Sequence, residues 1–275
     1  MKGVGSMTLY RLVDTHAHLD QLEDVEGALG EARRLGLVAV VAVGTGYESN
    51  YRVLELAHKY PGTVYPALGL HPWEISRELP TLQESLGFIE DHLGLAVAVG
   101  EVGLDYDKRV RTLAGKDVQQ AVLRDLLALA KRHEKPVSFH SRYAWKDSLA
   151  LVQHSGVTRV VFHWFTGFSS VLAELVAEGY FISATPAAEY HQEHRRAVKE
   201  APLSRLLLET DCPVDYGREV RYTSRVRDIV RSLGAVSEIK GLDMSVVAAE
   251  TTRNALEFFG IERPHPFLDT FRARD

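Results

Sequence analysis

Eight short apolar segments alternate with stretches of helical spacing along the 275 residues of the chain. The segment 37–43 is apolar throughout, which is typical of a strand that is buried on both faces. The stretch 117–133 places its apolar residues on one side, which is typical of an amphipathic helix. Strands that alternate with helices pair in parallel through right-handed crossovers. Eight such units predict closure into a single α/β barrel of the (β/α)8, or TIM, type.

No low-complexity linker and no break in composition divides the chain, so we predict one domain over residues 9–260. Strands are predicted over residues 9–13, 37–43, 63–70, 95–99, 136–139, 157–162, 179–183 and 203–208. Helices are predicted over residues 23–35, 49–60, 82–93, 117–133, 145–154, 169–178, 191–199, 221–233 and 245–259. Residues 102–116 are predicted to be a charged loop, residues 1–8 a flexible leader and residues 261–275 a C-terminal tail of the same domain.

The charge balance limits how the chain can bind nucleic acid. It carries 32 Lys and Arg residues against 37 Asp and Glu residues, a formal charge of −5. A nucleic-acid substrate would therefore be held by a local basic patch or by metal ions rather than by global attraction.

The sequence also bears on the compartment. Its one cysteine, Cys212, excludes an internal disulfide, which fits a reducing cytoplasm. No apolar run reaches the roughly 18 residues of a membrane span, and the first residues lack the apolar core of a signal peptide. We predict a cytoplasmic protein without a membrane segment, and nothing in the sequence indicates an obligate protein partner.

Two histidines, His16 and His18, follow the first predicted strand and are separated by one residue. On an extended backbone such side chains point to the same side, so both can converge on one point. Imidazole is the commonest protein ligand for metals, but a single pair of this kind also occurs where histidines merely cap a strand. The weight of the prediction therefore comes from the residues that follow the other strands.

Potential metal ligands follow several of the predicted strands, on the side where barrel enzymes keep their chemistry. They are His16, His18, Glu101, His140, His163 and Asp211. Four imidazoles and two carboxylates exceed what one tetrahedral ion needs, so we predict two divalent ions. An open doubly wound sheet, the rival fold, would not naturally bring ligands from these strands to one point.

The order of the strands suggests how these residues share two ions. His16 and His18 would hold one ion, His140 and His163 the other, and Glu101 would bridge them. Two cations about 3.5–4 Å apart stabilise both the attacking and the leaving oxygen of a displacement, and a metal lowers the pKa of bound water from 15.7 toward about 7.

Asp211 would ligate a metal and orient or deprotonate the attacking water. Mixed histidine and carboxylate sites accept Zn, Mg, Mn, Fe or Ni, so the sequence leaves the metal open.

The same segments resemble those of TatD-type metal-dependent deoxyribonucleases, in order and in spacing. The matching segments are residues 14–19 (DTHAHL), 69–72 (GLHP), 100–106 (GEVGLDY), 136–142 (PVSFHSR), 163–167 (HWFTG), 209–213 (ETDCP) and 251–255 (TTRNA) with 259–260 (FG). The resemblance spans about residues 9–260. It implies a barrel of the amidohydrolase superfamily, two divalent metals held by the six residues above, and hydrolysis of DNA phosphodiester bonds, often from the 3′ end.

Three further residues are candidates for substrate binding. The resemblance implies that His71 faces the scissile phosphate, with a purely structural role as the alternative. Arg142 lies two residues after His140 and could clamp a phosphate, unless it is a surface residue paired with an acid. Glu209 lies two residues before Asp211 and either orients a ligand or the water, or forms an ion pair inside the barrel.

Aromatic and basic residues near the strand ends could hold single-stranded DNA, with packing and solvation as the alternatives. The aromatic candidates are Trp73, Tyr106, Tyr143, Trp164, Phe165 and Tyr216, and the basic ones are Lys108, Arg109, Arg111 and Lys116. Residues 214–226 lack the Pro-rich basic segment that members of the family commonly carry, which leaves substrate length and strand preference open.

We therefore predict a metal-dependent hydrolase that acts as a 3′–5′ exonuclease on single-stranded DNA ends. The predicted catalytic residues are Asp211, Glu101 and His71. An amide, lactone or aminoacyl-ester hydrolase built on the same dinuclear site is the alternative. A non-enzymatic subunit that binds a partner is the third hypothesis, and such a protein would be expected to lack some of the metal ligands.

Overall fold

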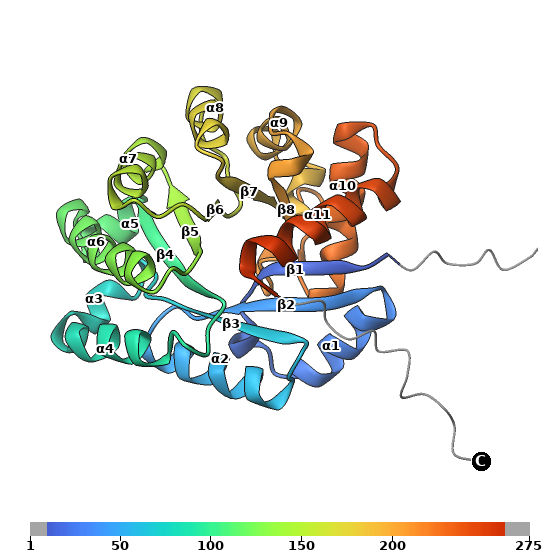
Figure 1. The fold of residues 1–275 in the computed structure, drawn as a ribbon. Helices are drawn as coiled ribbons and strands as arrows, with labels where there is room; N and C mark the ends of the chain where they lie inside the picture. The colour runs from blue at the N-terminus through green and yellow to red at the C-terminus, as the bar shows by residue number, and fades with distance from the viewer. Residues whose placement is uncertain (1–9, 262–275) are drawn as a thin grey trace, which may run out of the picture.

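The computed structural model describes residues 10–261. Its main sheet has eight strands in the order β1 to β8, and each neighbouring pair is parallel (Figure 1). The strands are β1 Leu12–Ala17, β2 Leu37–Val43, β3 Val64–Leu68, β4 Ala98–Asp105, β5 Val137–Arg142, β6 Val160–Phe162, β7 Phe181–Ala184 and β8 Leu206–Leu208. Together with the helices between them they form a nearly closed TIM barrel, which confirms the predicted fold class.

Helices follow the strands and surround them (Figure 1). They are α1 Val25–Arg34, α2 Tyr47–Lys59, α3 Ile75–Glu78, α4 Leu82–His92, α5 Lys108–Leu113, α6 Lys116–Arg132, α7 Trp145–Ser155, α8 Ser169–Ala177, α9 Gln192–Glu200, α10 Ile229–Lys240 and α11 Met244–Phe259. Among the residues described here, no helix combines the length and the apolar character that a membrane crossing requires. The cytoplasmic location stays a prediction.

Three predicted elements were wrong. The charged loop predicted over 102–116 holds the end of β4 and the helix α5, which begins because the side chain of Asp107 caps it. The strand predicted to end at residue 99 is β4, which continues to Asp105, because Val102 and Leu104 are buried and pair with β5. The helix predicted over 221–233 is displaced: α10 begins at Ile229 and continues through Gly234, which costs only about 1 kcal/mol in a helix interior. The predicted leader, 1–8, and nearly all of the predicted tail lie outside the described residues, so the domain limits stay predictions.

The barrel has two apolar layers. Val40 and Ala42 of β2 pack in a cluster with buried residues of the surrounding helices, such as Leu29 of α1 and Val53 of α2, so they face outward. Ala39 and Val41 alternate with them and pack in a second cluster inside the barrel. The period of two in a strand thus separates an outer layer, which holds the helices, from an inner filling.

The last turn of α11 closes the amino-terminal end of the barrel. Phe258, Phe259 and Ile261 belong to the inner cluster, with exposed fractions of 3%, 4% and 5%. Arg159, which precedes β6, donates a hydrogen bond of 3.0 Å to the carbonyl oxygen of Phe258. This plug leaves the carboxyl-terminal end of the strands as the open end.

The seam between β1 and β8 is joined by a buried side chain. Asp14 is fully buried, and its Oδ1 accepts the backbone N–H of Thr210 at 3.0 Å while Oδ2 accepts the Thr210 hydroxyl at 2.5 Å. The backbone N–H of Asp211 donates to the carbonyl oxygen of His16 at 2.8 Å, and that of His18 donates to the carbonyl oxygen of Cys212 at 2.9 Å. The seam therefore holds His16, His18 and Asp211 beside one another.

We expect Asp14→Ala to lower the free energy of unfolding by about 2–4 kcal/mol, because it leaves two buried donors of Thr210 without an acceptor. Urea denaturation measures the loss. The control is Asp24→Ala, which removes the exposed cap of α1 and should cost only about 1 kcal/mol. Equal losses in the two variants would contradict a structural role for the seam.

Candidate metal centre

The side chain of Glu101 lies between two groups of histidines. Its Oε2 is 3.3 Å from Nε2 of His16 and 3.5 Å from Nε2 of His18. Its Oε1 is 3.0 Å from Nδ1 of His140 and 2.9 Å from Nε2 of His163. Each carboxylate oxygen therefore faces one histidine pair, which is the arrangement that a bridging ligand needs.

Asp211 and His71 complete this cluster from two sides. Oδ1 of Asp211 lies 3.6 Å from Nε2 of His16 and 3.3 Å from Nε2 of His18. Nε2 of His71 lies 3.3 Å from Oε1 of Glu101. The structure thus brings all six predicted metal ligands, and His71, to one place at the carboxyl-terminal end of the barrel.

Burial and the charges of the neighbours shift the pKa values of this cluster. Burial opposes the charged form of Glu101, but His71, His163 and His16 outweigh it and hold the pKa of Glu101 well below its usual range. Burial likewise opposes protonation of His18, yet a hydrogen bond with Asp211 and the charge of Glu101 raise the pKa of His18 to about 9. The Glu101 carboxylate is therefore ionised and attracts cations, and His18 carries a proton wherever a metal does not take its place.

The donor set fits divalent ions. Nε2 of His16 is buried and has no hydrogen-bond partner among the described residues, although it points at two carboxylates. Three ligand atoms lie within 4.8 Å of one another in the group His16, His18 and Glu101, and again in the group His71, Glu101 and His140. A bound cation would satisfy the free nitrogen and balance the acidic charge.

Comparison with known proteins shows which family the chain belongs to. A model of the family of TatD related DNases matches residues 13–260. The chain belongs to this family. It is 35% identical over 259 residues to human "Deoxyribonuclease TATDN3", covering 90% of this chain and 94% of that protein. It is 30% identical to the "Uncharacterized metal-dependent hydrolase YabD" of Bacillus subtilis, covering 91% and 99% of the two chains. The crystal structure of the TatD homologue YJJV from Escherichia coli superposes with a TM-score of 0.81 at 30% identity, covering 92% and 100%.

Asp105 contacts the candidate ligand His140 on the side of the ring that faces away from Glu101. Its Oδ2 lies 3.2 Å from Nε2 of His140 and accepts the indole N–H of Trp73 at 2.7 Å. The backbone N–H of Asp105 donates to the side-chain oxygen of Gln119 at 2.8 Å. Burial acts to raise the pKa of Asp105, but the hydrogen bond and charge of His140 lower it to about 2. The carboxylate is therefore ionised and fixes the orientation of the His140 ring.

We expect Asp105→Asn to weaken metal affinity or activity about 10–100-fold, because the His140 ring loses its charged partner. Metal titration and initial rates measure the change. Asp147→Asn is the matched control, since that carboxylate accepts only the Tyr106 hydroxyl in the described contacts. Equal effects in the two variants would show that Asp105 does not position His140.

Glu209 contacts the cluster from the other side. It is fully buried, its Oε1 lies 3.5 Å from Nδ1 of His163, and the same oxygen accepts the backbone N–H of Trp164 at 3.0 Å. Since Nε2 of His163 faces Glu101, Glu209 lies on the far side of that ring. This geometry is that of a carboxylate that orients a ligand, one of the two readings of the sequence.

The predicted Arg142 lies on β5, and 39% of its side chain is exposed. Its Nη2 is 3.4 Å from Oδ2 of Asp107, so it has the acidic partner that the alternative reading of the sequence described. The guanidinium also lies 5.6 Å from the centre of the Tyr143 ring. Its exposed part is still available to an anion at the open end of the barrel.

Residues 215–223, where the sequence departs from the usual TatD pattern, form a small antiparallel hairpin of β9 Asp215–Tyr216 and β10 Tyr222–Thr223. Gly217 has a φ of 101°, and a Cβ there would meet the carbonyl oxygen of Val220 at 2.0 Å. The hairpin packs Tyr216 against the Trp164 ring, with ring centres 5.3 Å apart. It therefore shapes the rim beside His163.

Two supporting residues were not predicted from the sequence. Ser138 lies two residues before His140 on β5, and its hydroxyl is 3.1 Å from Nδ1 of His16. That spacing was a usable signal, since both side chains point to one face. The buried His194 accepts the backbone N–H of Thr185 and contacts the carbonyl oxygen of Phe165, at 3.1 and 3.0 Å. No pattern in the sequence indicates these two contacts.

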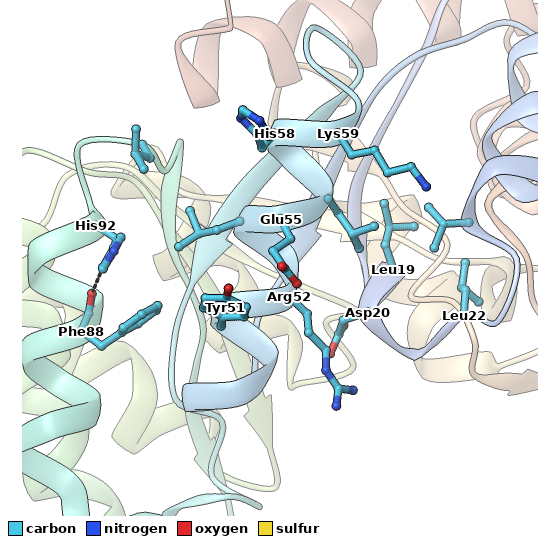
Figure 2. A pocket seen from close by; sticks show the side chains of 14 residues that line it. Leu19, Asp20, Leu22, Tyr51, Arg52, Glu55, His58, Lys59, Phe88 and His92 are labelled. Carbon is cyan, nitrogen blue, oxygen red and sulfur yellow. Dashed lines mark hydrogen bonds between the residues drawn. The ribbon is translucent and has the colours of Figure 1, made fainter.

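An apolar groove of about 720 Å³ lies on the outside of the barrel, between α2 and α4 (Figure 2). Tyr51 and Phe88 are among the residues that line it. None of the six candidate ligands lines this groove. The metal centre is instead a compact buried cluster that opens at the strand ends.

Proposed function

We propose that this chain is a metal-dependent deoxyribonuclease that removes nucleotides from the 3′ ends of single-stranded DNA. The observation that carries the proposal is the placement of Glu101, whose two oxygens face His16 and His18 on one side and His140 and His163 on the other. A carboxylate that faces two histidine pairs suits a two-metal site, and two metal ions stabilise the attacking and the leaving oxygen of phosphodiester hydrolysis.

The proposed assignment of ligands follows these distances. His16, His18 and Asp211 would hold one divalent ion, and His140 with His163 would hold the other. Zn, Mg, Mn, Fe and Ni all suit such donors. The ions would supply an activated water and stabilise negative charge on the phosphate oxygens.

The chain itself would orient the substrate. The Asp211 carboxylate, at the seam beside His16 and His18, would orient the attacking water or accept its proton. His71 lies beside Glu101 and would face the scissile phosphate. Arg142 would bind a phosphate oxygen through its exposed part. The exposed Lys108, on α5, would add positive charge that a protein of formal charge −5 needs locally.

Metal-reconstituted protein incubated with 5′-labelled single-stranded DNA tests the proposal. We expect a ladder of products that shortens with time in Mg, Mn or Zn, and no cleavage of circular single strands, which lack ends. Cleavage of circles would replace the exonuclease with an endonuclease.

Small esters and amides provide the comparison with the alternative activity. Their hydrolysis, with DNA intact in every metal, would replace the proposal with an amide, lactone or aminoacyl-ester hydrolase. Inhibition by phosphate and nucleotide monophosphates should be strong for a nuclease only.

A further inference from the structure

Trp73 is an exposed aromatic residue whose position is fixed. It follows β3, and 54% of it is exposed. Its indole N–H donates a 2.7 Å hydrogen bond to Oδ2 of Asp105, and its backbone N–H donates to Nδ1 of His71 at 3.1 Å. A single exposed apolar residue is ordinary, but an exposed ring that is tied to a buried carboxylate has a defined orientation.

The ring lies next to the metal centre. The rings of Trp73 and His71 meet edge to face with centres 5.3 Å apart, and His71 is 3.3 Å from Glu101. The carboxylate that holds the indole also lies 3.2 Å from His140. His71 alone therefore lies between the indole and Glu101, and Asp105 alone lies between the indole and His140.

Four of the other aromatic candidates near the strand ends do not offer the same surface, and the fifth, Trp164, is only partly exposed and packs against Tyr216 with ring centres 5.3 Å apart. Tyr106, Phe165 and Tyr216 are buried, with exposed fractions of 8%, 1% and 1%, so their faces are already covered. Tyr143 is 60% exposed, but the Arg142 guanidinium lies 5.6 Å from its ring centre. Trp73 combines exposure, anchoring and closeness to the cluster.

We propose that Trp73 is the stacking platform for the nucleobase next to the phosphodiester that is cut, and that it selects unpaired ends. The inference rests on the proposed hydrolysis of DNA. Stacking on an aromatic ring tolerates every base, because each base has a π face. A base inside a duplex has both faces covered by its neighbours and could not lie on the indole. The anchored N–H lowers the entropy lost when a base is bound.

The experiment compares Trp73→Ala and Trp73→Phe in the metal-loaded full chain, with single-stranded DNA as substrate. We expect Trp73→Ala to raise KM roughly 10-fold with a much smaller change in kcat. Trp73→Phe retains a ring but loses the N–H, and we expect its KM to rise only a few-fold, well short of that of Trp73→Ala. Tyr51→Ala is the control: Tyr51 is 53% exposed in the outer groove, and its loss should change neither constant.

Oligonucleotides in which one position at a time lacks its base identify the contact. In the wild type, one base-free position near the end should raise KM about 10-fold, and Trp73→Ala should add nothing at that position. If Trp73→Ala raised KM by the same factor at every base-free position, the inference would be overturned. A Trp73→Phe protein as impaired as Trp73→Ala would also overturn it, since the bond to Asp105 would then be what matters.

The two proposals fail separately. A wild-type protein that cleaves no DNA in any metal would refute the proposed function, and the inference with it. A wild-type protein that cleaves DNA while Trp73→Ala keeps its KM would refute the inference alone.

Discussion

Glu101→Gln is expected to lower the rate of phosphodiester hydrolysis about a thousandfold or more. The substitution preserves the shape of the side chain but removes the charge that faces both histidine groups. Metal analysis after equilibration should show fewer ions per chain than in the wild type. Initial rates on labelled single-stranded DNA, at saturating metal, measure the catalytic loss.

The matched control is Glu90→Gln, which alters a partly exposed glutamate that pairs with Arg132 and His133 on the outside of the barrel. It should keep the wild-type rate and metal content. A Glu101→Gln protein that retained about a tenth or more of the wild-type rate would show that no bridging carboxylate is needed.

Removing the metal is expected to abolish activity and to change how stability depends on pH. The folded-state pKa of His18, about 9, lies above the unfolded value of about 6.5. The contribution of protonated His18 to the free energy of unfolding is therefore fully present below about pH 6.5, and it is lost as the pH rises through about 9. Urea denaturation of chelator-treated protein should show the free energy of unfolding falling across this range.

Metal binding should show the opposite trend. A cation must displace the proton of His18 below about pH 9, so the apparent affinity should fall as the pH is lowered. Calorimetric titration in buffers of different ionisation enthalpy would count the released protons. His18→Gln should weaken both pH dependences, whereas His58→Gln, in the outer groove, should keep them. If both pH dependences were identical in His18→Gln and the wild type, His18 would not be a metal ligand.

The barrel and the grouping of the candidate ligands followed from two periodicities. Apolar strands that alternate with amphipathic helices are compatible with only a few topologies. A barrel brings the carboxyl-terminal ends of all its strands to one side. That is why His16 and Asp211 could be placed together although 195 positions separate them in the chain. The extension of β4 past Glu101 was hidden because Glu101, Gly103 and Asp105 interrupt its apolar pattern.

The supporting contacts could not be read from the sequence, because they depend on how loops and strand edges meet. The pairing of Asp14 with Thr210 requires the register at the seam. The bond from Trp73 to Asp105 joins the loop after β3 to the end of β4, and neither residue carries a spacing signal that points to the other. Such contacts orient the ligands rather than supply them.

The plug formed by the last turn of α11 has a practical consequence. Tyr10 leads into β1 at the amino-terminal end of the barrel, and Ile261 packs into the inner cluster at that same end. Both ends of the described chain therefore leave on the face opposite the catalytic mouth. Coupling either end to a bead or a fluorophore should leave the approach of a long polymer unobstructed, so single-molecule recordings of digestion are feasible with this protein.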